Sequence, residues 1–130
     1  MSALKKILMV DDEEDFCFFV KNHLERTGRF EVRTVSHGRA ALKESRSFQP
    51  DLILLDIIMP DISGDEVAES LLEDPDTREI PFVFLSALAS QLQERDDSPV
   101  KKIGGRHFIG KPISKGRLLE AIDSMLDQKM

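Results

Sequence analysis

Polar side chains that can bind a metal or take part in a reaction follow four of the apolar runs in this chain. The acids Asp11, Asp12 and Asp56 come after two of these runs, and Ser86 and Lys111 come after two others. Carboxylates that share a site raise one another's proton affinity unless a cation lies among them, and Mg²⁺ prefers such hard oxygen ligands. A carboxylate beside Mg²⁺ can attack phosphorus as a nucleophile, while an ammonium and a hydroxyl bind the other phosphoryl oxygens. If these residues meet, they predict a Mg²⁺ site at which Asp56 forms an aspartyl-phosphate.

The elements that would bring these residues together are short β-rich runs that alternate with helical patterns. This alternation is typical of an α/β fold with a parallel sheet wrapped by helices. We predict five strands, over residues 7–10, 30–35, 52–55, 81–85 and 106–109. The first, third and fourth are continuously apolar, as central strands are, and the other two suit the edges. Ligands of such sheets bind outside the carboxyl ends of the strands, which is where the polar residues lie.

Helices are predicted between these strands from apolar residues at helical spacing. They cover residues 16–24, 40–45, 67–72 and 118–126, and Ser114 is the expected N-cap of the last one. The stretch from Leu88 to Gly105 is different because it contains an acidic pair and Pro99. Ser98 and Pro99 read as an N-cap and a first helical position. We therefore expect a long loop after the fourth strand and only a short helix over about 99–103.

Composition excludes several classes of function. The 130 residues predict one domain, 1–130, and 41% hydrophobic with 32% charged residues is typical of a soluble globular protein. The net charge of -6 opposes binding to nucleic acid or to anionic lipid. No stretch approaches the roughly 18 apolar residues of a membrane span. The single cysteine, Cys17, reads as a small hydrophobe on a helix and suits a reducing compartment, so we expect a cytoplasmic protein.

Five short motifs in this order resemble the response-regulator receiver family of two-component signalling. They are Asp11-Asp12 after an apolar strand, Asp51-Leu-Ile-Leu-Leu-Asp56, Met59-Pro60-Asp61 with Gly64, Ser86-Ala87, and Lys111-Pro112. The matches run along the whole chain, and together they are far more specific than any one of them. The resemblance implies a flavodoxin-like, doubly wound sheet of five strands in the order 2-1-3-4-5. It also implies that a sensor histidine kinase or phosphotransfer protein phosphorylates an aspartate in the presence of Mg²⁺.

The resemblance assigns a role to each matching residue. Asp56 is expected to be the phosphoacceptor and a Mg²⁺ ligand, Asp12 a direct ligand, and Asp11 a ligand mainly through water. The backbone carbonyl of Ile58 would complete the protein ligands. Ser86 is expected to be the switch hydroxyl and Lys111 the counter-ion of the phosphate. Phe108, three residues before the lysine, would change its packing on activation, although passive packing is an equally good interpretation.

Alternative interpretations remain open at this point. In one alternative, the acids near Asp11 have no catalytic role and simply supply favourable negative charge at a helix N-terminus. An enzyme of the aspartyl-phosphate phosphatase class is a second reading, although it needs an acid two residues after the nucleophile, where this chain has Ile58. A third is an interaction module that works without phosphorylation, and a further open choice is between a lone receiver and a fragment of a longer regulator.

The resemblance also implies a surface for output, and this chain departs from the family there. Family members commonly bind downstream proteins, or a second copy of themselves in homodimers, through the fourth helix, the fifth strand and the last helix. The sequence does not identify the downstream target of this chain. The segment between Ser86 and Lys111 is about three residues longer than the family suggests. The extra residues fall in the predicted loop and short helix. Partner binding is therefore least predictable at this surface.

Overall fold

A six-stranded sheet forms the centre of the protein in a computed structural model that describes residues 4–87, 100–111 and 113–127. The strand order is β2-β1-β3-β4-β6-β5. The strands are β1 (Lys5–Val10), β2 (Phe30–Val35), β3 (Leu52–Asp56), β4 (Phe82–Ser86), β5 (Lys101–Ile103) and β6 (Arg106–Gly110). All pairs are parallel except β5 with β6. The predicted α/β class and the predicted order of five parallel strands are confirmed.

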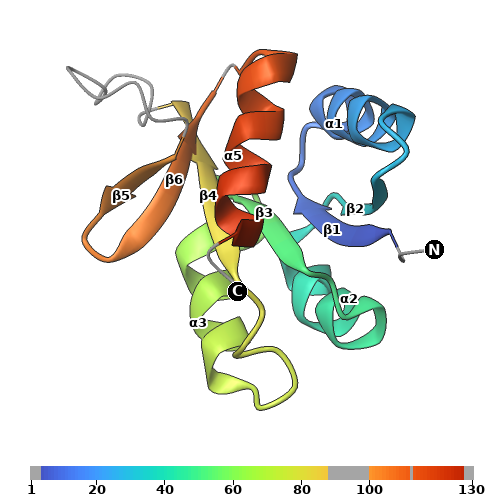
Figure 1. The fold of residues 1–130 in the computed structure, drawn as a ribbon. Coiled ribbons are helices and arrows are strands. Elements are labelled where there is room, and N and C mark those ends of the chain that lie inside the picture. Colours follow the sequence, from blue (N-terminus) through green and yellow to red (C-terminus); the bar gives the residue numbers. More distant parts are fainter. Residues whose placement is uncertain (1–3, 88–99, 112, 128–130) are drawn as a thin grey trace.

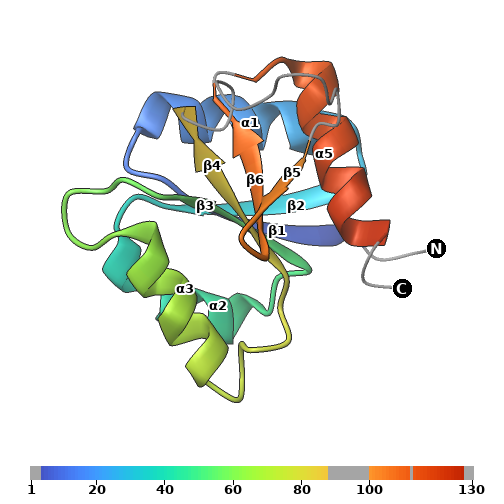
Figure 2. The ribbon, with the colours of Figure 1, turned by 90° about the vertical axis from the view of Figure 1, so that its left-hand side faces the viewer.

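Helices cover both faces of this sheet (Figures 1 and 2). The helix α1 (Glu14–Arg26) and the helix α5 (Lys115–Asp127) lie on one face, and α2 (Ala41–Phe48) and α3 (Gly64–Glu73) lie on the other. A short 3-10 turn, η1 (Gly38–Ala40), leads into α2. Within the described ranges, none of these helices combines the length and the apolar character needed to cross a membrane.

Alternation along the central strands produces two hydrophobic cores. On β1, Ile7 and Met9 pack toward α1 and α5, whereas Leu8 and Val10 pack toward α2 and α3. All five residues of β3 are buried, because helices cover both of its faces. Burial on the edge strand β2 alternates in its first half instead. The apolar runs of the sequence therefore lie where the sheet has no solvent-facing side.

Local hydrogen bonds explain where two of the helices begin. Ser63 and Glu66 form a reciprocal capping box at the start of α3. The backbone N–H of Arg117 donates to Ser114 Oγ over 3.3 Å at the start of α5, which confirms the N-cap predicted from the sequence. The start of α3 sets the path of the chain out of β3, and the start of α5 sets its path out of β6.

The predicted short helix over about 99–103 is wrong in its described part, because Lys101–Ile103 forms β5. Gly104 and Gly105 both have positive φ angles, of 58° and 80°, and turn the chain into an antiparallel hairpin with β6. A two-residue turn with two positive φ angles is the favoured hairpin connection, and Gly-Gly suits it. The proposed cap at Ser98 and Pro99 and the loop from Leu88 lie outside the described residues. The sheet therefore has six strands instead of the five predicted.

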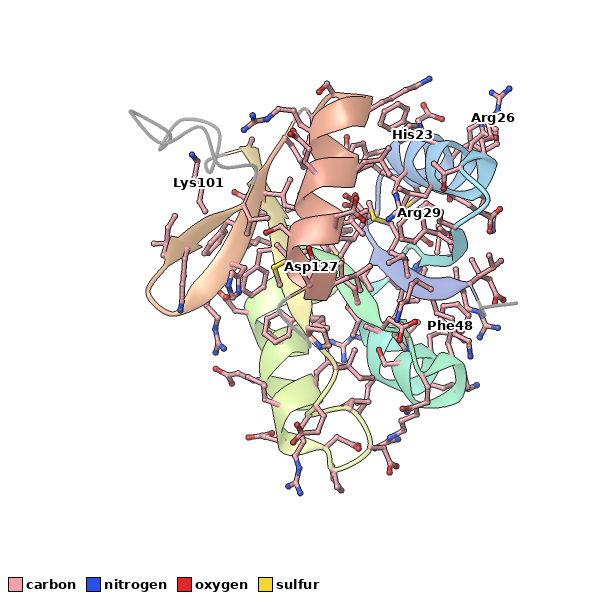
Figure 3. All side chains as sticks on the ribbon, in the orientation of Figure 1. His23, Arg26, Arg29, Phe48, Lys101 and Asp127 are labelled. Carbon is pink, nitrogen blue, oxygen red and sulfur yellow. The ribbon has the colours of Figure 1, made fainter. Side chains whose placement is uncertain are left out.

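The hairpin forms one edge of the sheet, and β2 forms the other. Figure 3 shows Lys101 on the hairpin side of the molecule and Phe48, at the end of α2, on the opposite side. The guanidinium of Arg33, on β2, lies 4.4 Å from the centre of the Phe48 ring. A cation above an aromatic face is a favourable contact that also covers the ring.

Ser45, in α2, is a buried polar residue within the second core. Among the described residues, its Oγ is buried without a hydrogen-bond partner. An unsatisfied buried hydroxyl costs about 1–3 kcal/mol. We expect Ser45→Ala to raise the free energy of unfolding by about 1 kcal/mol more than Ser47→Ala, measured by urea denaturation. Ser47 is the matched control, because it lies exposed on the same helix and its Oγ donates to Glu44 O. Equal effects of the two variants would contradict this account.

Candidate functional site

The carboxyl ends of β1, β3, β4 and β6 meet at one edge of the sheet and carry the polar residues that the sequence singled out. The ends of β4 and β6 are joined through the Lys111 N–H, which donates to the Ser86 carbonyl over 3.0 Å. A cavity of about 540 Å³ opens at this edge. Its lining includes Asp12, Asp56, Ile58, Ser86 and Lys111, together with Glu13 and Phe16. The structure thus brings residues from four strands into one site.

Three carboxylates form a cluster in this site. One oxygen from each of Asp11, Asp12 and Asp56 lies within 4.8 Å of the others. Asp11 is fully buried, Asp56 is 7% exposed, and Asp12 is exposed. Burial first, and then the negative charges of Asp11 and Asp12, raise the pKa of Asp56 to about 6. A hard divalent cation would relieve this repulsion, and the donor set, which consists of carboxylate oxygens only, suits Mg²⁺.

Lys111 is the cation that faces this cluster. Its Nζ lies 2.9 Å from Asp11 Oδ2 and 2.9 Å from Glu13 Oε1, but 3.7 Å from Asp56 Oδ1. Lys111 and Asp56 therefore form an ion pair, but the distance between them is too long for a hydrogen bond. Although burial opposes the charged ammonium, the hydrogen bonds to Glu13 and Asp11 raise the pKa of Lys111 above its usual value. The lysine therefore stays charged and within reach of any group added to Asp56.

The other expected site residues also lie at or near this edge. Ser86 ends β4 and is 8% exposed at the cavity wall. Ile58 lies at the cavity with its side chain 77% exposed. Phe108 lies deeper, on β6, half-buried with its ring centre 5.3 Å from that of Phe84. The predicted roles of the Ile58 carbonyl, of Ser86 and of Phe108 stay predictions, but their positions are compatible with those roles.

Gly64, which belongs to one of the sequence motifs, allows the start of α3 to approach the backbone of β3 closely. A Cβ at this position would lie 2.4 Å from the carbonyl oxygen of Asp56 and 2.7 Å from Cα of Ile57. The Gly64 N–H also donates to the Ile57 carbonyl over 2.7 Å. The start of α3 is therefore packed directly against the backbone of the candidate nucleophile. Only glycine permits this close approach.

Asp61 holds the same loop from its other side. Its carboxylate accepts hydrogen bonds from the N–H groups of Gly38 and Arg39, over 3.1 and 2.9 Å. These bonds, that of Arg39 foremost, lower the pKa of Asp61 to about 2. The loop that follows Asp56 is thereby tied to η1, which precedes α2. Asp61 belongs to one of the sequence motifs, but no local signal in the sequence shows which backbone groups it binds.

Cys17 is buried next to Asp11, and its thiol is not a reactive nucleophile. It is buried on α1, and its thiol donates to the Asp11 carbonyl over 3.2 Å. Burial, reinforced by the charge of Asp11, raises the pKa of the thiol to about 12. The thiol therefore remains protonated at neutral pH, and its expected role as a small buried residue on a helix is confirmed.

The raised pKa of Asp56 has a consequence for stability. The folded protein binds the proton of the Asp56 carboxyl group more tightly than the unfolded chain does. Ionisation of Asp56 therefore lowers the free energy of unfolding above pH 6. This cost disappears as the pH falls from 6 toward 4. With metal chelated, we expect Asp56→Asn to raise the free energy of unfolding by about 2 kcal/mol at pH 8 and by much less at pH 4.5. Urea denaturation at both pH values measures the difference.

Glu69→Gln is the control for this prediction. It removes one negative charge from the exposed face of α3, outside the carboxylate cluster. We expect little change in stability and little dependence on pH from this variant. A gain for Asp56→Asn that is the same at both pH values would contradict the account of Asp56.

Comparisons with known proteins agree with this arrangement. Residues 7–123 match the family described as "Response regulator receiver domain". The polar-differentiation response regulator DivK of Brucella ovis is 36% identical over 122 residues, which cover 94% of this chain and 96% of the relative. The fold is similar to that of the chemotaxis response regulator CheY4 of Vibrio cholerae, with a TM-score of 0.78, 24% identity, and coverage of 95% and 99%. A CheY-like receiver domain protein from Methanospirillum hungatei has a TM-score of 0.76, 26% identity, and coverage of 98% and 97%. The chain belongs to the response regulator receiver family of two-component signalling.

Proposed function

We propose that Asp56 accepts a phosphoryl group from a sensor histidine kinase or a phosphotransfer protein, in a reaction that requires Mg²⁺. One observation carries the proposal: Asp56 lies in an open cavity within 4.8 Å of two further carboxylates and 3.7 Å from Lys111. In this reaction a carboxylate oxygen of Asp56 attacks phosphorus, and a new P–O bond forms. The bond from phosphorus to the donor's imidazole nitrogen breaks, and its electron pair leaves with the donor.

The residues around Asp56 divide the remaining work. Asp11, Asp12 and Asp56 would hold Mg²⁺, with the Ile58 carbonyl as a further ligand. When bound, Mg²⁺ supplies positive charge that offsets the carboxylates and the phosphoryl oxygens. Lys111 binds one phosphoryl oxygen as a counter-ion, and the Ser86 hydroxyl binds another. These groups come from the ends of four strands, so a change at the phosphate reaches all four.

The signal would leave the site through β4 and β6. When Ser86 moves toward the phosphate, space opens beside it, and Phe108 changes its packing against Phe84. The resulting change in the surface of β6, α5 and the preceding hairpin alters partner binding, including pairing with a second copy of the chain. The structure favours this reading over a phosphatase, because Ile58 places an exposed apolar side chain where such an enzyme needs an acid. We propose a cytoplasmic switch that does not turn over substrate as an independent enzyme.

The kinase would approach on the side of α1. Phe18 is 71% exposed on this helix, and Phe16 of the same helix lines the cavity. The helix is joined to α5 by a hydrogen bond between His23 Nε2 and the Lys115 carbonyl, 3.2 Å apart. An exposed aromatic residue on this helix supports docking of a partner there, although a single exposed apolar residue is common on protein surfaces.

Incubation with acetyl phosphate and Mg²⁺ tests the proposal. We expect the intact mass to rise by one phosphoryl group, and Asp56→Asn or an excess of chelator to abolish the rise. Asp51→Asn is the matched control. Asp51 precedes the opposite end of β3, where its carboxylate accepts a hydrogen bond from the Lys6 N–H over 2.8 Å. This variant should label like the wild type. Undiminished labelling of Asp56→Asn would overturn the assignment.

Loss of the lysine should separate phosphorylation from its response. We expect Lys111→Ala to accept some phosphoryl groups, but to show a much smaller beryllofluoride-induced change in the NMR signals of the Phe108 ring. The physical reason is that the variant lacks the ammonium group that would move toward the new charge. Lys115→Ala, on the exposed first turn of α5, is the control and should respond like the wild type. A full response at Phe108 in Lys111→Ala would contradict this mechanism.

A further inference from the structure

The carboxylate of Glu13 is part of the site, although nothing in its motif assigns it a role. Its Oε1 lies 2.9 Å from Lys111 Nζ, as close as the fully buried Asp11. The side chain of Glu13 is 62% exposed, that of Lys111 only 14%. The lysine is thus held between one carboxylate that cannot leave the protein interior and one that is largely hydrated.

The backbone position of Glu13 makes this contact unusual. Glu13 is the N-cap residue of α1, and its side chain makes no capping hydrogen bond. Asp, Asn, Ser and Thr are preferred at this position because their short side chains reach the free N–H groups of the first turn. The Glu13 N–H instead donates to Asp11 Oδ1 over 2.9 Å, which anchors the residue beside the cluster. A residue that breaks a local preference without a structural gain is expected at functional sites.

We propose that Glu13 is a displaceable counter-ion that holds Lys111 away from Asp56 until a phosphoryl group arrives. This inference rests on the proposed function of Asp56. A phosphoryl oxygen on Asp56 competes for the ammonium hydrogen that now points to Glu13. Because Glu13 is hydrated and Asp11 is buried, the bond to Glu13 breaks first and the bond to Asp11 remains. Glu13 is a positioning residue, since it acts on the phosphoryl group only through Lys111.

The energetic consequence has a definite sign. Every contact that Lys111 makes with Glu13 stabilises the unphosphorylated arrangement and has to be lost in the phosphorylated one. An ion pair with one exposed partner contributes little, so its loss should shift the balance by about two- to fivefold. Glu13 would therefore set how readily the site accepts an anionic group, without touching that group.

Beryllofluoride binding in saturating Mg²⁺ tests this inference, with three variants compared by NMR or calorimetric titration. We expect Glu13→Gln to bind beryllofluoride about two- to fivefold more tightly than the wild type. Glu13→Asp should behave similarly, although it keeps the negative charge, because a shorter carboxylate falls short of Lys111 and suits the cap of α1. Glu14→Gln is the control, because it removes the adjacent acid. Glu14 is the first residue of α1 and lines a different pocket from Glu13, so this variant should change the affinity much less.

The outcomes separate the possible explanations. If Glu14→Gln tightens binding as much as Glu13→Gln, or if Glu13→Asp binds like the wild type, net charge alone explains the effect and the inference is overturned. Unchanged affinity in all three variants overturns it as well. If the wild type neither binds beryllofluoride nor is labelled by acetyl phosphate, the proposed function fails, and the inference fails with it.

Discussion

A fully buried carboxylate, that of Asp11, has to be compensated by a positive charge. An unpaired charge in a protein interior costs several kcal/mol. Among the described residues, the Oδ1 atom of Asp11 accepts a hydrogen bond from the Glu13 N–H, and its Oδ2 atom pairs with Lys111 at 2.9 Å. The lysine lies 100 residues further along the chain. This single pair therefore joins the first strand of the fold to the end of the last one, and it also brings the counter-ion to Asp56.

The same cluster makes the ionised form of Asp56 energetically unfavourable. Burial, and after it the negative charges of Asp11 and Asp12, raise the pKa of Asp56 to about 6 although Lys111 acts in the opposite direction. A group that adds negative charge here can be stabilised only if the cations respond, and Lys111 is the cation closest to Asp56 among the described residues. Electrostatic repulsion that lowers stability is thus also what would make the site sensitive to phosphorylation. A site of this kind trades stability for function.

Backbone contacts keep this strained arrangement in place. The start of α3 is packed against the Asp56 carbonyl through Gly64, and the loop between them is tied to η1 through Asp61. These contacts hold Asp56 at the end of β3, so that a response has to come from side chains and from the ends of β4 and β6.

Local sequence patterns predict where the parallel strands lie and which residues follow them, whereas the order of the strands in the sheet follows from the family resemblance. A buried strand needs a continuous apolar run, and Asp56, Ser86 and Lys111 lie where such runs stop. The pair Gly104-Gly105 is a local signal for the β5–β6 hairpin, whereas Pro99 nearby favours the start of a helix. The contact of Glu13 with Lys111 and the packing of Gly64 on Asp56 arise only when the chain folds. These contacts depend on how segments far apart in the chain approach each other, and no local pattern encodes that distance.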